Sequence, residues 1–254
     1  MKQLRFHQRA SAGRTVFGIA VTWPSAGMIE CVGQAWDFVW IDAQHGTLDF
    51  SSILECVRAC DLVGAAAFVR VPGHASEFIG PILDLAPAGI IVPMVNTEEQ
   101  ARTVVSHARF APLGCRSYGG RRICDLHGRQ YVSEANSGQL LIVQVETPEA
   151  VDNAEAIAAV PGGDWLLFGP DDTRVRLDLP MDSPLTEEPL ASMARRTVQA
   201  AAQVGKGVIV PVGSNPALIR WALGLGFRGL VVGSDVGFAR DGSAKARAIA
   251  DEFA

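Results

Sequence analysis

The chain has 254 residues, of which 48% are hydrophobic and 19% are charged, and its formal net charge is −5. This composition allows a large buried core and excludes an extensively disordered chain. The negative charge argues against dedicated nucleic-acid binders and proteins of anionic membrane surfaces, because both depend on a basic surface.

Eight short hydrophobic runs recur along the chain, and each predicts a β-strand. The runs are almost continuously hydrophobic instead of alternating, which is typical of strands that are buried on both faces. They cover residues 16–22, 38–43, 66–71, 89–95, 140–146, 165–170, 207–212 and 229–235.

The segments between these runs predict helices. Residues 50–62 repeat hydrophobic side chains with a helical period. Thr97 and Gln100 have the spacing of a capping box, in which each side chain binds a free amide of the first turn. Further helices are expected to begin at Pro148 and Pro216, which each follow a capping residue, and to cover 187–204 and 244–253.

Eight strand–helix units in a chain of this length predict an α/β fold, a (β/α)8 TIM barrel that spans residues 1–254 as one domain. A doubly wound open sheet is the alternative, but regular units without a break in composition favour a closed barrel. One segment, at about 111–139, is longer than a plain connection and rich in polar residues and glycine. We expect it to be an active-site loop with a short helix.

Polar and charged side chains gather where the predicted strands end. TIM-barrel active sites lie at the carboxyl ends of the strands, and a charge inside a hydrophobic strand is costly to bury unpaired. Carboxylates beside one arginine and one histidine predict a divalent-metal site with hard oxygen ligands. An internal ion pair of the arginine with one of the carboxylates is the alternative. The side chains concerned are Asp42, His45, Arg70, Gln144, Glu146, Asp171, Asp172 and Asp235.

Lysine is scarce, since the chain has only Lys2, Lys206 and Lys245. An aldolase that forms an imine needs a lysine inside the barrel. Lys206 precedes the seventh predicted strand, and the other two lie near the ends of the chain. Metal-assisted enolate chemistry is therefore the natural route by which this barrel would make or break a carbon–carbon bond.

The five cysteines predict reduced thiols, because their number is odd and no two of them form a C-x-x-C pair. The first fifteen residues lack the hydrophobic centre of a signal peptide, and no hydrophobic run approaches the length of a membrane span. We therefore expect a cytoplasmic protein that does not interact with a membrane.

Several segments resemble the class II pyruvate aldolases of the HpcH/HpaI aldolase and citrate lyase superfamily. The resemblance follows the chain in order, through DFVWIDAQHG, FVRVPG, VQVETPEAV, LFGPDD and GLVVGSD. It implies a TIM barrel that uses a divalent metal ion, Mg²⁺, Mn²⁺ or Co²⁺. It also implies a homo-oligomer, either a hexamer or a trimer of dimers.

The resemblance assigns roles to the residues at the strand ends. Glu146 and Asp172 would be the two metal ligands. His45 would be the acid/base, with Asp42 and Asp84 as the candidate carboxylates that orient it. A histidine titrates near neutral pH, which suits proton transfer to and from a substrate hydroxyl.

The same resemblance implies how a substrate would bind. Arg70 and Gln144 would contact the keto oxygen, and the amides of Asp171 and Asp172 would bind the carboxylate of a 2-oxo acid. The implied reaction is the reversible cleavage of a 4-hydroxy-2-oxo acid to pyruvate, or hydroxypyruvate, and an aldehyde.

Two features depart from the family pattern. Gln44 stands where many members have Glu, so the site lacks one potential negative charge near His45. The turn after the sixth strand contains Arg174 and Arg176, which would either bind an acidic aldehyde or face the solvent. These departures leave the aldehyde open.

The same scaffold also suits alternative functions. An oxaloacetate decarboxylase or a citrate-lyase-like enzyme would use the same enolate chemistry, but a CoA-dependent enzyme would need a basic nucleotide-binding surface that the sequence does not show. A non-catalytic binding protein would explain Gln44. The presence of His45, Arg70, Glu146 and Asp172 argues against that function.

Overall fold

The computed structural model describes residues 4–253, and its eight strands form a closed parallel barrel. Each strand pairs with the next one along the chain, and β1 pairs with β8 to close the barrel. The TIM barrel is therefore confirmed, and the open sheet is wrong. The strands are β1 (Val16–Val21), β2 (Phe38–Asp42), β3 (Ala66–Arg70), β4 (Gly89–Val92), β5 (Leu140–Val145), β6 (Trp165–Phe168), β7 (Gly207–Pro211) and β8 (Gly229–Ser234).

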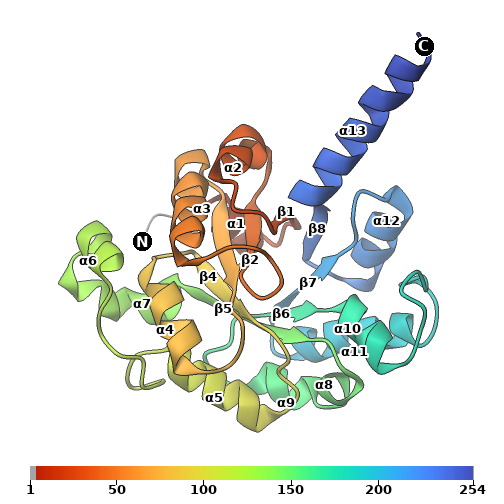
Figure 1. The fold of residues 1–254 in the computed structure, drawn as a ribbon. Coiled ribbons are helices and arrows are strands. Elements are labelled where there is room, and N and C mark those ends of the chain that lie inside the picture. Colours follow the sequence, from red (N-terminus) through yellow and green to blue (C-terminus); the bar gives the residue numbers. More distant parts are fainter. Residues whose placement is uncertain (1–3, 254) are drawn as a thin grey trace.

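Helices surround the barrel on its outer side (Figure 1). The predicted caps form: the hydroxyl groups of Thr97 and Thr147 and the side chain of Asn215 each accept a hydrogen bond from an amide of the following first turn. The helices are α1 (Arg5–Ser11), α2 (Ala26–Val32), α3 (Phe50–Val63), α4 (Ser76–Asp84), α5 (Glu98–Ala108), α6 (Arg121–His127), α7 (Val132–Gly138), α8 (Pro148–Asp152), α9 (Ala154–Ala159), α10 (Pro170–Arg176), α11 (Leu190–Gln203), α12 (Pro216–Leu225) and α13 (Asp235–Asp251), with the short 3-10 helices η1 (Gly33–Ala35) and η2 (Arg129–Tyr131).

The hydrophobic residues form two main clusters, one between the strands and the outer helices and one inside the barrel. Phe6 of α1 belongs to the inner cluster and is 1% exposed. Its ring makes edge-on contacts with Phe38 and Phe68, which belong to β2 and β3. Helix α1 thus fills the amino end of the barrel, and the carboxyl end remains for a site.

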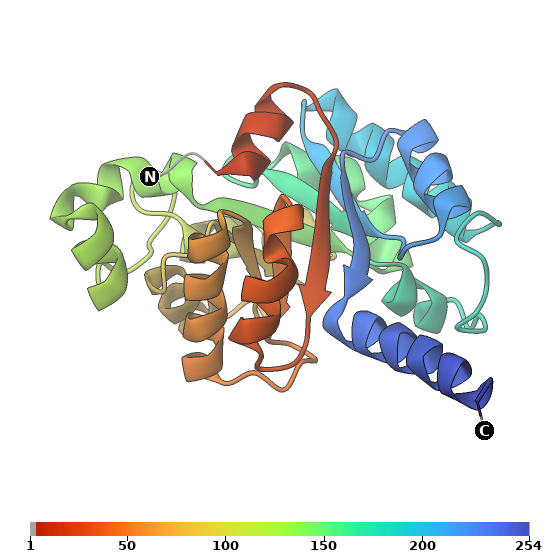
Figure 2. The same cartoon turned by 90° about the horizontal axis from the view of Figure 1, so that it is seen from above.

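The last helix differs from the prediction, because α13 begins at Asp235 and not at Ala244. Ser234 caps it by accepting a hydrogen bond from the amide of Gly237. Glycine lowers helix propensity, and Gly237 and Gly242 hid this first half of the helix from the sequence pattern. From residue 238 onward the helix is exposed, and it runs away from the barrel (Figures 1 and 2).

The long segment at 111–139 folds into α6, η2 and α7 with a small core of its own. Phe110, Ile123, Tyr131 and Ala135 are buried together there. The segment lies beside α4 on the flank of the barrel. Within one chain it does not provide the expected active-site loop, since none of its residues lines the cavity at the carboxyl ends of the strands.

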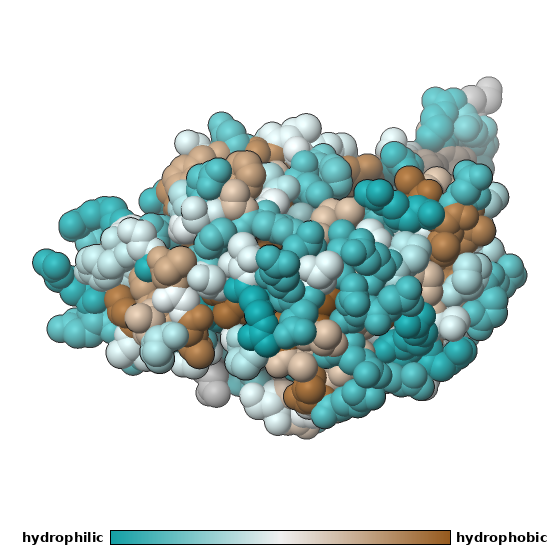
Figure 3. All heavy atoms as spheres, turned by 90° about the horizontal axis from the view of Figure 1, so that it is seen from below, coloured by the Kyte–Doolittle hydropathy of each residue, from teal (hydrophilic) through white to brown (hydrophobic). Residues whose placement is uncertain are grey.

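Polar residues cover most of the face seen in Figure 3, and the hydrophobic residues on it form separate small groups. Between residues 4 and 253, no helix combines the length and the hydrophobicity that crossing a membrane requires.

Candidate active site

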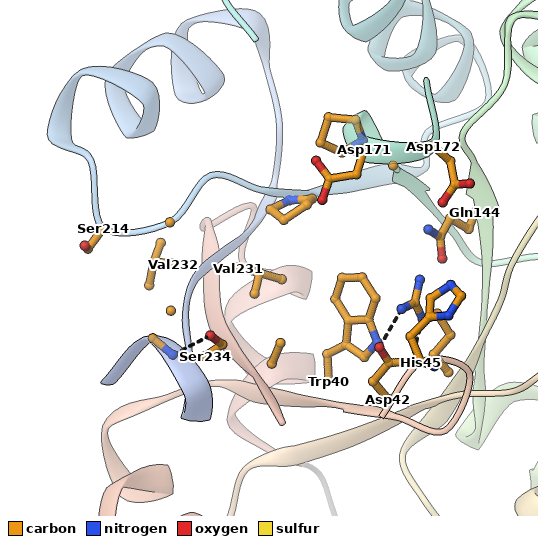
Figure 4. A pocket seen from close by; sticks show the side chains of 18 of the residues that line it. Trp40, Asp42, His45, Gln144, Asp171, Asp172, Ser214, Val231, Val232 and Ser234 are labelled. Carbon is orange, nitrogen blue, oxygen red and sulfur yellow. Dashed lines mark hydrogen bonds and ion pairs between the residues drawn. The ribbon is translucent and has the colours of Figure 1, made fainter. Parts of the chain in front are cut away.

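A cavity of about 480 Å³ opens at the carboxyl ends of the barrel strands. It collects side chains from β2, β3, β5 and β8 and from the turns after β6 and β7. Figure 4 shows Asp172, Gln144 and His45 on one side of it and Ser214 and Val232 on the other. Seven of the nine predicted site residues line this cavity, namely Asp42, His45, Arg70, Gln144, Glu146, Asp171 and Asp172. Asp235 does not line it, because its carboxylate accepts hydrogen bonds from the amides of Thr22 and Trp23 instead.

Arg70 is fixed in the cavity by an ion pair with Asp42. Nε and Nη2 of Arg70 lie 2.8 and 2.5 Å from the two carboxylate oxygens, and the guanidinium group lies 4.7 Å from the centre of the Trp40 ring. Burial alone would raise the pKa of Asp42, but the hydrogen bonds and charge of Arg70 outweigh it, so the pKa of Asp42 is lowered. The internal ion pair does form, and it holds Arg70 against the cavity without removing it from the lining.

Asp42 also holds the loop that carries His45, although through the backbone. Its Oδ1 accepts hydrogen bonds from the amides of Gln44 and His45 at 3.1 and 3.3 Å. A Cβ on Gly46 would lie 2.2 Å from the carbonyl oxygen of Asp42, so the tight turn requires glycine here. The imidazole of His45 is thereby presented at the mouth of the cavity, while the Oε1 of Gln44 is buried without a partner among the described residues.

Asp84 is a second predicted site residue that the structure does not bring to the cavity. It is the last residue of α4, shortly before β4 begins, so it lies toward the amino end of the barrel. Its Oδ1 binds Nη2 of Arg116 at 2.9 Å. Within one chain, Asp84 therefore stabilises the 111–139 segment instead of orienting His45.

Glu146 is a buried carboxylate with few compensating contacts. It is 1% exposed, and its oxygens accept hydrogen bonds from the amide of Met94 at 2.7 Å and from Nε2 of Gln144 at 2.5 Å. Burial raises its pKa to about 7; the Met94 amide opposes this, and the nearby charge of Asp172 adds to it. A Cβ on Gly169 would lie 2.6 Å from that of Glu146, so glycine leaves the space that this side chain needs.

The donor set of the cavity fits a divalent cation. Glu146 and Asp172 supply hard oxygen ligands, and a bound cation would offset both the burial of Glu146 and the nearby charge of Asp172, which together raise the pKa of Glu146. Over residues 4–253, no three His, Cys, Asp or Glu side chains form a complete metal site. An ion held by two carboxylates would keep positions open for water or for substrate oxygens.

No lysine among the described residues lines the cavity. Lys206 binds the carbonyl oxygens of Ala158 and Val160 before β7, at the opposite end of the barrel. Lys245 is exposed on α13, and Lys2 lies outside the described residues. Imine chemistry therefore has no support in the described part of the chain.

Several lining residues were not predicted from the sequence. Trp40 was not predicted, although the alternation of side chains along a strand points to it. Trp40 and Asp42 are two residues apart in β2, so their side chains lie on the same face of the strand. Phe238 and Asp241 of α13 also line the cavity. They had no detectable signal, because the helix was expected to begin later.

Known proteins resemble this chain in sequence and in structure. A 4-hydroxy-2-oxovalerate aldolase of Novosphingobium aromaticivorans is 44% identical over 158 residues, which is 61% of this chain and 60% of that protein. A hydroxypyruvate/pyruvate aldolase of Rhizorhabdus wittichii is 33% identical over 76% of this chain and 77% of its own length. The crystal structure of an HpcH/HpaI aldolase/citrate lyase family protein of Burkholderia cenocepacia J2315 superposes with a TM-score of 0.86 and 26% identity, over 94% of this chain and 95% of that one.

A sequence model of the HpcH/HpaI aldolase/citrate lyase family matches residues 23–241. The match extends from the turn after β1 into α13 and includes every residue that lines the cavity except Ala20. The chain therefore belongs to the HpcH/HpaI aldolase/citrate lyase family.

Proposed function

We propose that the chain is a divalent-metal-dependent aldolase that reversibly cleaves a 4-hydroxy-2-oxo acid to pyruvate, or hydroxypyruvate, and an aldehyde. The observation that carries this proposal is the buried Glu146 beside Asp172, in one cavity with Arg70 and His45. The relatives with aldolase names support the reaction class.

Arg70 is suited to stabilise the negative oxygen that develops when the carbon–carbon bond breaks. A divalent cation at Glu146 and Asp172, with Mg²⁺, Mn²⁺ or Co²⁺ as candidates, would supply a Lewis acid to the same keto group. Because Asp42 already fixes the guanidinium group, Arg70 needs no rearrangement as charge forms, and a preorganised donor is worth more than a mobile one. Gln144, whose Oε1 has no partner in the described structure, would contact the same end of the substrate.

The first turn of α10 is suited to bind the substrate carboxylate. The amides of Asp171 and Asp172 lie there, and the first amides of a helix have no partners within it. A 2-oxo acid bound in this way would have its keto group toward Arg70 and its remaining carbons toward the mouth of the cavity.

His45 is the group that would move the proton. In cleavage, it takes the proton of the C4 hydroxyl, the C3–C4 bond breaks, and the electron pair moves to C3 and the keto oxygen. The C4 carbon leaves as an aldehyde. Protonation of C3 then gives pyruvate, and the reverse order gives aldol addition.

Metal removal tests this function directly. Pyruvate release is measured on a panel of 4-hydroxy-2-oxo acids, with enzyme stripped by a chelator and then supplied with Mg²⁺, Mn²⁺ or Co²⁺. We expect activity to fall at least about a hundredfold on stripping and to return with metal, since Lewis-acid stabilisation contributes several kcal/mol. Activity that survives thorough chelation would contradict the metal-dependent mechanism.

We also propose that copies of the chain assemble into a homo-oligomer, a hexamer or a trimer of dimers. Helix α13 is exposed from residue 238 onward and makes few contacts with its own barrel, and isolated helices in water are only marginally stable. Light scattering coupled to size exclusion should give a mass several times that of one chain. A mass equal to one chain at micromolar concentration would contradict assembly.

A cytoplasmic location stays a prediction. It is supported by the five free cysteines. Cys56 and Cys60 of α3 are fully buried in the core, as expected for packing residues, and burial raises the pKa of Cys56 to about 11. Such thiols are unreactive.

A further inference from the structure

Asp235 lies at the carboxyl end of β8, but its carboxylate points to the neighbouring strand and not into the cavity. It is the first residue of α13 and is 3% exposed. Its Oδ2 accepts hydrogen bonds from the amides of Thr22 and Trp23, both at 2.8 Å. Its Oδ1 accepts hydrogen bonds from Oγ1 of Thr22 at 3.1 Å and from the amide of Val236 at 2.8 Å. The carboxylate of Asp235 therefore fixes the turn that follows β1.

The same turn holds the loop that carries His45. Strand β1 lies between β8 and β2 in the barrel, so the turn after β1 can contact the ends of both neighbours. The carbonyl oxygen of Thr22 accepts a hydrogen bond from the amide of Thr47 at 2.8 Å. A Cβ on Gly46 would lie 2.8 Å from the same oxygen, so the loop passes close to the turn. Asp235 is thus connected to the loop of His45 through Thr22.

The backbone of this loop sets the position of the His45 imidazole. The imidazole is exposed, and no side chain between residues 4 and 253 holds it by a hydrogen bond or an ion pair. Asp42 anchors residues 44–46, because its side chain and its carbonyl oxygen accept hydrogen bonds from their amides. Thr22 anchors the next residue, Thr47. Loss of this second anchor would release the loop on the far side of His45.

We infer, on the basis of the proposed function, that Asp235 is a positioning residue that keeps the acid/base His45 in place through Thr22. Displacement of a catalytic group by about 1 Å can cost about a hundredfold in rate. A residue that contacts neither metal nor substrate can therefore control turnover. The proposed sites of the metal and of the 2-oxo acid are built on β3, β5 and α10, so they do not depend on this anchor.

Asp235→Ala tests the anchor, because alanine suits a helix and removes both acceptor oxygens. We expect the rate of pyruvate release from a 4-hydroxy-2-oxo acid, in a single turnover of the metal-loaded enzyme, to fall at least about tenfold. The affinities for Mn²⁺ and for pyruvate should stay within about twofold of those of the unaltered enzyme, since the residues proposed to bind them are unchanged. Asp235→Asn should restore the rate to within about threefold, because its amide oxygen can still accept from the amides of Thr22 and Trp23.

A double variant separates the positioning of His45 from a general loss of structure. In His45→Ala the imidazole is absent, so the addition of Asp235→Ala should lower the remaining rate by no more than about twofold. An equal loss of rate in both backgrounds would mean that Asp235 acts on the whole site, and would overturn its role as a positioning residue for His45.

Asp37→Ala is the matched control, because Asp37 is also buried and also accepts a hydrogen bond from an amide of β1. Its partner is the amide of Phe17, at the amino end of the strand. The substitution should lower the melting temperature and leave the rate of pyruvate release unchanged. A loss of rate as large as that in Asp235→Ala would overturn the proposed role, since any disturbance of β1 would then be sufficient.

Thr22→Gly tests the same connection if Asp235→Ala does not fold. It keeps the buried carboxylate and loosens the turn, so the rate should fall about fivefold, and only while His45 is present. A rate within about twofold of that of the unaltered enzyme in the folded variants would overturn the role of Asp235 and leave the aldolase intact. A loss of Mn²⁺ affinity as large as the loss of rate would have the same consequence. Absence of pyruvate from every substrate with every metal, in the unaltered enzyme, would overturn the aldolase and the role of Asp235 with it.

Discussion

Glu146→Gln is expected to lower kcat/KM for pyruvate release at least about a hundredfold and to weaken the binding of Mn²⁺ by a similar factor. The substitution keeps the shape of the side chain and removes its charge. Glu146 is 1% exposed and lies beside Asp172. No carboxylate at the protein surface can therefore take its place as the second metal ligand. Calorimetric titration with Mn²⁺ and the pyruvate assay measure the two effects separately.

The pH dependence of metal binding provides a second measurement for Glu146. Because the pKa of Glu146 is raised to about 7, metal and proton compete for this carboxylate, and the affinity for Mn²⁺ should fall as the pH falls through 7. In Glu146→Gln this dependence should disappear. Above pH 7 the metal-free variant should melt no lower than the unaltered protein, because glutamine carries no buried charge.

Glu149→Gln is the matched control, since Glu149 is an exposed carboxylate on α8, three residues further along the chain. Its metal affinity and activity should equal those of the unaltered enzyme. If Glu146→Gln bound Mn²⁺ with full affinity, Glu146 would not be a metal ligand. If it bound Mn²⁺ normally and only turnover fell, the carboxylate would act in another step.

The position of the site followed from the sequence because strand ends are easy to recognise. Near-continuous hydrophobic runs mark buried parallel strands, and the polar residues that end them must share one rim of a closed barrel. Seven of the eight residues predicted at the strand ends meet there for this reason. The observed strand boundaries differ from the predicted ones by a few residues. The largest difference is at the end of β4, where Pro93 has no amide to donate and Met94 has a positive φ of 57°.

The partners of the charged side chains did not follow from the sequence, because they depend on register and on helix direction. Asp42 and Arg70 are neighbours in the ladder between β2 and β3, and this register decides which carboxylate Arg70 binds. Asp84 has the same chemistry as Asp42, but it ends a helix that runs opposite to the strands. Arg174 pairs with Asp171 one helical turn away. This pairing forms because α10 begins at Pro170 and so brings the two residues to the same face of the helix.

His45→Ala is expected to lower kcat at least about a hundredfold while the affinity for Mn²⁺ stays unchanged. His45 lines the cavity at its mouth, and the loop that carries it is held by hydrogen bonds from backbone amides to Asp42. Loss of the imidazole therefore removes proton transfer and leaves Glu146 and Asp172 in place. Single-turnover pyruvate release and Mn²⁺ titration measure the two quantities.

His127→Ala is the control for this substitution, because His127 ends α6 on the 111–139 segment and does not line the cavity. Its kcat should match that of the unaltered enzyme. Full activity in His45→Ala would exclude the imidazole as the acid/base. A water molecule held at the same rim would then have to take the proton.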